Sequence, residues 1–97
     1  MPFQFRFKDS FQKDLSRLSA HDYSLVLKTL DEIESVLKTG SPSQGLRIKK
    51  LHGNPAYKIF EARASINLRI VWTQTKSEMT FALLGNHEDV RRFIKNL

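Results

Sequence analysis

The sequence has 97 residues, is 40% hydrophobic and carries a formal net charge of +6, which fits a single domain over residues 1–97 with a modest core. It has no cysteine and three widely spaced histidines, so we predict no disulfide, no metal site and no cofactor. No apolar run approaches the ~20 residues that cross a bilayer, and the first residues lack the apolar stretch of a signal peptide. We therefore expect a cytoplasmic protein with no membrane partner.

The N-terminal third predicts one strand and two helices. Three phenylalanines alternate with polar residues over 3–8, which is the period of a strand with one buried face. Asp9 followed by Gln12 fits a capping box and predicts a helix to about Ser19. An apolar stripe at spacings of three and four predicts a second helix over about 22–38.

The C-terminal part predicts three strands and a last helix. Residues 46–51 are expected to form a basic connector, the strands to cover about 57–64, 68–75 and 78–84, and the helix about 88–97. The predicted order is β-α-α-β-β-β-α. It indicates an α+β fold in which the two N-terminal helices pack on one face of an antiparallel sheet.

The other face of this sheet is expected to be open and charged. Side chains alternate across a strand, and the small and apolar residues of the second and third strands must point inward. This places Glu61, Arg63 and Arg69 together on the outer face.

Basic residues gather in the middle of the chain. Between Ser35 and Ser77 there are eight lysines and arginines against a single acid, Glu61, a net charge of +7. This concentration favours a phosphate-rich partner or an acidic protein segment. A solvated basic surface without a partner is the alternative.

Residues 51–63, 68–72 and 83–90 resemble the RelE/ParE superfamily of bacterial toxins. The shared features are a leucine-x-glycine turn, a strand ending in arginine, a strand with arginine near its start, and a last strand running into a histidine-bearing turn. The resemblance implies a RelE-like fold and the toxin component of a type II toxin–antitoxin system. It further implies an acidic cognate antitoxin as partner and cleavage of messenger RNA on the ribosome, which inhibits translation.

The resemblance also implies a set of site residues on the open face of the sheet. Arg63 and Arg69 match the two strand arginines of the RNA-cleaving members, and His87 stands where YoeB-like toxins have histidine. The lysine pair that RelE carries on its second strand is expected to be missing, because Glu61 falls in that region, and Arg91 replaces a common tyrosine. A YoeB-like set of Glu61, Arg63, Arg69 and His87 is therefore expected.

These residue types suit the attack of an RNA 2′-hydroxyl on the adjacent phosphate. The reaction needs a base, for which Glu61 is the candidate, and an acid, for which His87 is suited because histidine titrates nearest neutrality. Arg63 and Arg69 would stabilise the charge that develops on the phosphate. Such an endoribonuclease needs no metal. The residues expected to bind RNA are Arg47, Lys49, Lys50, Lys58 and Arg91.

Other interpretations stay open at this point. Glu61 and Arg63 would also suit an exposed ion pair, and His87 a polar residue at the start of the last helix. A ParE-like toxin would bind DNA gyrase without catalytic residues. A catalytically inactive module that only binds the antitoxin is a third possibility, since a shared fold does not decide function.

Overall fold

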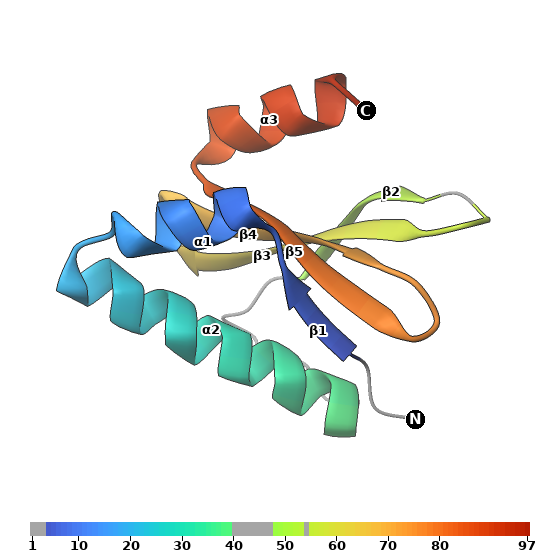
Figure 1. The fold of residues 1–97 in the computed structure, drawn as a ribbon, viewed down its shortest axis with the longest axis horizontal. Coiled ribbons are helices and arrows are strands. Elements are labelled where there is room, and N and C mark those ends of the chain that lie inside the picture. Colours follow the sequence, from blue (N-terminus) through green and yellow to red (C-terminus); the bar gives the residue numbers. More distant parts are fainter. Residues whose placement is uncertain (1–3, 40–47, 54) are drawn as a thin grey trace.

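The computed structural model describes residues 4–39, 48–53 and 55–97. Within them the chain forms five strands and three helices (Figure 1). In chain order these are β1 (Gln4–Phe7), α1 (Asp9–Ser16), α2 (Ala20–Thr39), β2 (Lys49–Gly53), β3 (Lys58–Ser65), β4 (Leu68–Gln74), β5 (Glu78–Gly85) and α3 (His87–Lys95). The predicted α+β class is confirmed, with one more strand than expected.

The described strands form one sheet in the order β1-β5-β4-β3-β2. The expected antiparallel meander of β3, β4 and β5 is confirmed. The expectation of a wholly antiparallel sheet is wrong, because β1 pairs with β5 in parallel. Parallel neighbours need a long connection, and two helices and three strands separate β1 from β5 in the chain.

The expected basic connector is also wrong in part, because Lys49–Gly53 is the edge strand β2. Its register with β3 shifts between Lys50 and His52, so the bulge at Leu51 disrupts the alternation that marks a strand in a sequence. Exposed lysines suit an edge strand, because they oppose pairing with another chain.

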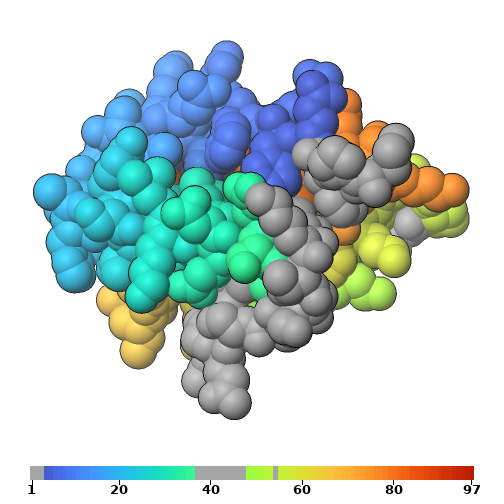
Figure 2. Space-filling view, turned by 90° about the horizontal axis from the view of Figure 1, so that it is seen from below, coloured from blue at the N-terminus to red at the C-terminus, as the bar shows by residue number. Residues whose placement is uncertain are grey.

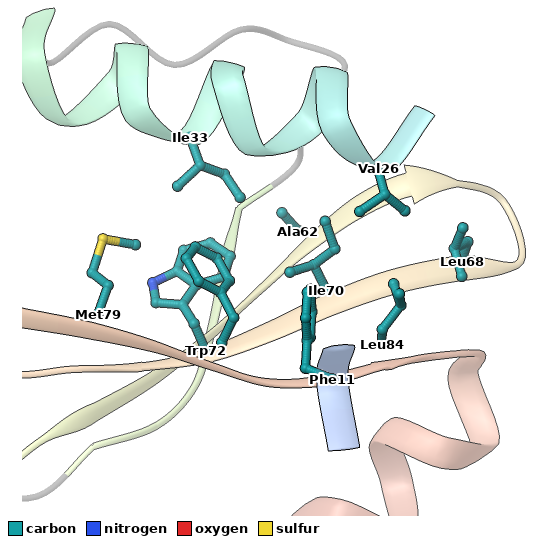
Figure 3. Packing of buried hydrophobic residues seen from close by; sticks show 10 residues of the cluster. Phe11, Val26, Ile33, Ala62, Leu68, Ile70, Trp72, Met79 and Leu84 are labelled. Atoms are coloured by element: carbon teal, nitrogen blue, oxygen red, sulfur yellow. The ribbon is translucent and has the colours of Figure 1, made fainter. Parts of the chain in front are cut away.

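Helices α1 and α2 cover one face of the sheet and bury the main core. Val26 and Ile33 of α2 point onto the sheet, Ile33 toward Trp72 of β4 and Val26 toward Ile70 (Figure 3). Phe11 of α1 is fully buried in the same cluster and packs beside Phe81. Seen from the helix side, the end of the β3–β4 hairpin, in gold, projects past α2 (Figure 2).

Two helix starts differ from the expected ones. The capping box expected at Asp9 is wrong, since α1 begins after Lys8, which makes no side-chain capping bond among the described residues. The Gln12 amide instead donates to the Phe7 carbonyl at 3.0 Å. Helix α2 begins earlier than expected, after Ser19, whose hydroxyl accepts from the Asp22 N–H at 3.1 Å.

None of the helices in the described ranges is long and apolar enough to span a membrane.

The opposite face of the sheet is partly covered by α3 rather than wholly open (Figure 1). Ile59, Val71 and Val90 form a second, smaller buried cluster there, and Phe93 and Ile94 pack against it. The helix turns its apolar stripe to the sheet because Ile59 and Val71 offer apolar surface on the same face as Glu61 and Arg69. The outer face is therefore divided into an apolar part under α3 and a charged part beside it.

Candidate functional site

A pocket of about 530 Å³ lies between α3 and the strands β2, β3 and β4. Its lining contains more basic than acidic side chains. The charged and titratable residues that line it are Lys49, Glu61, Arg69, His87, Glu88, Arg91, Arg92 and Lys95. Since an excess of cations in a concave surface attracts and concentrates anions, this pocket suits a phosphate-bearing ligand.

The pocket has a buried ion pair in its wall. Arg69 donates from Nη1 to Oε1 of Glu61 at 3.2 Å, and the two side chains are only 12% and 6% exposed. The pairing of β3 with β4 brings the two residues together. Arg69 of β4 lies opposite Arg63 of β3, and Glu61 lies two residues before Arg63 on the same strand. The expected exposure of Glu61 is therefore wrong, and so is an exposed pair with Arg63, because the Glu61 carboxylate bonds Arg69.

One donor of this pair is left over. Nε of Arg69 is buried and has no hydrogen-bond partner among the described residues. An unsatisfied buried donor on a charged group costs free energy, and functional sites are places where such groups persist. Other atoms of the Arg69 side chain border the pocket, so the residue is placed to meet a ligand there.

Helix α3 brings His87 to the same pocket. Asn86 is the N-cap of this helix, and it forms a capping box with Asp89, in which Asn86 Oδ1 accepts from the Asp89 N–H and Asp89 Oδ2 accepts from the Asn86 N–H, both at 2.9 Å. His87 is the first residue of the helix, exposed at the pocket rim. The helix start thus determines where the His87 backbone lies relative to the pocket.

No family model matches the sequence, and no curated protein matches it. Solved structures do match. A chain of the archaeal RelE–RelB complex from Pyrococcus horikoshii has a TM-score of 0.71 at 18% identity, covering 89% of this chain and 96% of that one. YoeB from a Staphylococcus aureus dimer has a TM-score of 0.66 at 18% identity, covering 90% and 99%. A chain of the Escherichia coli DinJ–YafQ toxin–antitoxin complex has a TM-score of 0.66 at 15% identity, covering 93% and 98%.

The chain has the RelE-like fold. This confirms the fold that the resemblance implied from residues 51–90. The structure also establishes the order of the strands along the chain. The second strand of this RelE-like chain is β2, which carries Lys49 and Lys50. Residues 46–51 look like a connector in the sequence, which makes β3 the second strand when strands are counted from the sequence alone.

The structure brings together three of the four residues expected to be catalytic. Glu61, Arg69 and His87 line the pocket, whereas Arg63 is not among the described residues that line it. Arg63 lies directly across from Arg69 in the sheet and is half-buried. Its like charge beside Arg69 adds to the positive potential of this part of the sheet.

The residues expected to bind RNA divide in a similar way. Lys49 and Arg91 line the pocket. Lys50 is exposed but lies opposite Phe60 in the sheet and thus belongs to the face that α2 covers. Lys58 lines a separate hollow of about 360 Å³. Arg47 lies outside the described residues.

Sequence reasoning missed two basic residues of the pocket, Arg92 and Lys95. Both residues lie on the polar side of the last helix, and the sequence predicts only that this side is solvated. Across the described ranges, no group of three or more acidic, histidine or cysteine residues is arranged to hold a metal.

Proposed function

We propose that the protein is the toxin of a type II toxin–antitoxin system and acts as an endoribonuclease that cleaves messenger RNA on the ribosome. The observation that carries the proposal is Arg69, held by Glu61 in the wall of a cationic pocket that also contains His87 and Lys49. The likeness to RelE, YoeB and YafQ supports it at the level of the fold. The proposal places the protein in the cytoplasm, with ribosomes.

Arg69 is the group proposed to stabilise the phosphate in the transition state. Its guanidinium is anchored through Nη1, so its remaining donors are oriented before a ligand arrives. Preorganised donors aimed at developing negative charge contribute strongly to catalysis, because they need no reorganisation during the reaction. Lys49 would add a second positive charge, since it lies opposite Glu61 in the sheet and lines the same pocket.

Glu61 is proposed to hold Arg69 rather than to act as the base. Its carboxylate is buried and already bonded to the guanidinium, whereas a base must reach the 2′-hydroxyl of the substrate. His87 is exposed at the rim and is proposed as the acid that protonates the leaving 5′-oxygen, because an imidazole exchanges protons readily near neutral pH. The proton of the attacking 2′-hydroxyl would pass to solvent water in the open pocket. The cleavage would need no metal ion.

An acidic antitoxin is the proposed protein partner. The P. horikoshii relative is a RelE–RelB complex and the E. coli relative is a toxin–antitoxin complex. The +7 segment would favour a partner of opposite charge, because electrostatic complementarity speeds association and selects the partner. Co-purification with the product of the adjacent gene tests this, and a stable complex that blocks RNA cleavage is the expected result.

The test of the proposed function is cleavage of messenger RNA by the purified protein on translating ribosomes, mapped by primer extension. A DNA gyrase supercoiling assay run alongside covers the ParE-like alternative. We expect cleavage and no effect on supercoiling. Inhibition of gyrase without any cleavage would make the ParE-like action correct. Failure in both assays, with the antitoxin still bound, would leave only the inactive binding module.

The salt dependence of RNA binding tests whether the pocket contacts phosphate. Each phosphate contact to single-stranded RNA contributes about 0.7 to the slope of log K against log salt, because it releases counterions. Lys49→Gln should reduce that slope by about 0.7, measured with a single-stranded RNA whose 2′-hydroxyls are methylated to prevent cleavage.

Lys28→Gln is the matched control, because Lys28 is equally exposed but lies on α2, on the other side of the sheet. It should leave the slope unchanged. Equal slopes for the wild type and both variants would show that Lys49 makes no phosphate contact.

A further inference from the structure

The junction between β5 and α3 connects two residues of the proposed site. Gly85, the last residue of β5, lies directly opposite Arg69 in β4, and His87 follows two residues later. Residues paired across antiparallel strands lie about 5 Å apart. The position of His87 relative to Arg69 is therefore set by the path of the chain through Gly85 and Asn86.

Gly85 leaves space that the Asp89 side chain fills. A Cβ at position 85 would lie 2.5 Å from Oδ2, 2.8 Å from Cβ and 2.9 Å from Cγ of Asp89. These distances are far below van der Waals contact, so no larger residue fits unless the start of α3 moves. The absence of a side chain at Gly85 is thus what lets α3 begin this close to the sheet.

Asp89 is held in that space from two sides. Its Oδ2 accepts from the Asn86 N–H, and its Oδ1 accepts from Arg92 Nη2. Its own N–H donates to Asn86 Oδ1. Asn86 precedes His87 in the chain and Asp89 follows it by two residues. These bonds therefore hold the backbone on both sides of His87. The orientation of the first turn of α3 has little freedom left.

We infer that Gly85, Asn86 and Asp89 form a clamp that positions His87 against Arg69. The three residues act through His87, so they are positioning residues for the reaction. The inference rests on the proposed function for its effect on catalysis, whereas the clamp itself is a property of the free protein. The clamp in the free protein and its effect on catalysis can be measured separately.

Gly85→Ala is the first variant to make. We expect the rate of RNA cleavage at saturation to fall by about 100-fold, because a displacement of about 1 Å at a catalytic group has that effect, with KM changed by no more than about twofold because the other cations of the pocket remain. Gly53→Ala is the matched control. A Cβ at Gly53 would meet only Lys58 and Lys50 side-chain atoms at 3.7–3.9 Å, and this variant should cleave like the wild type.

A conservative rescue separates positioning from general damage. Asn86→Asp keeps a side-chain acceptor for the Asp89 N–H and should retain most of the activity, whereas Asn86→Ala removes it and should not. Combining Gly85→Ala with Asp89→Ala should give no greater loss than the more damaging single change, because both disrupt one contact. If Asn86→Asp is no better than Asn86→Ala, the clamp inference is overturned, even where Gly85→Ala fails to fold.

NMR of the free protein distinguishes failure of the clamp from failure of the proposed function. Asn86→Ala should shift the ring signals of His87 and abolish the slow hydrogen exchange of the Asp89 amide, while Gly53→Ala should do neither. If these changes occur but the wild type cleaves no RNA, the clamp stands and the proposed function fails. If the His87 signals and the amide protection are unchanged, the clamp does not exist.

Discussion

Replacing Glu61 by alanine should lower the free energy of unfolding by about 3 kcal/mol, because it would leave the Arg69 guanidinium buried without its carboxylate. The lower end of the usual range is expected, since the pair borders a pocket that water enters. Urea denaturation followed by the fluorescence of Trp72 measures this. The indole is buried in the main core and reports on global unfolding.

The matched control is Glu78→Ala. Glu78 accepts from Arg6 Nε at 3.2 Å, the same distance as in the buried pair, but these side chains are 37% and 56% exposed. An exposed pair contributes less than about 1 kcal/mol because water solvates both charges in either state. If the two alanine variants cost the same, the Glu61–Arg69 pair is not desolvated in solution and its role in the pocket has to be reconsidered.

A double variant shows whether the pair serves stability or function. Glu61→Leu combined with Arg69→Met should recover most of the stability lost in Glu61→Ala, because buried ion pairs are often replaced by apolar residues without loss. The same double variant should be inactive in RNA cleavage, since the phosphate would meet no guanidinium. Recovery of stability with loss of activity would assign the pair to function.

His87→Ala should reduce the rate of messenger RNA cleavage by about 100-fold or more, the usual contribution of a general acid. The side chain is exposed, so the stability of the fold should be unchanged. The rate is measured in a single turnover on translating ribosomes, where binding and release do not limit it. His21→Ala is the control, because His21 is an exposed histidine on α2, away from the pocket.

Arg69→Lys should be at least as damaging to cleavage, with a loss of about 100-fold or more. Lysine keeps the positive charge but cannot bond Glu61 and the phosphate at the same time in the planar geometry of a guanidinium. Combining it with His87→Ala should give less than the product of the two losses, because residues that act on one transition state are not independent. If both single variants cleave like the wild type, the catalytic assignment is wrong.

Local pattern was enough to predict most of the elements. Helices α2 and α3 and strands β3 to β5 show clear apolar periods, and the structure confirms them within a few residues. Strand β2 was missed because it lies at the sheet edge with a bulge at Leu51, which is its one large apolar residue, so it shows no alternating pattern. The parallel pairing of Phe5 with Met79 was missed because the two residues lie far apart in the sequence and no local pattern near either one predicts its partner strand.

The sequence by itself determined the α+β class, the basic middle segment and the types of residue that the pocket contains, because these depend on periodicity, composition and short motifs. Only the tertiary structure decided that α3 covers the outer face, that Glu61 is buried against Arg69, and that Lys49 belongs to the pocket while Arg63 does not. The reason is physical. Burial and ion pairing depend on which surfaces meet across long stretches of chain, and a local pattern states only which face of an element is apolar.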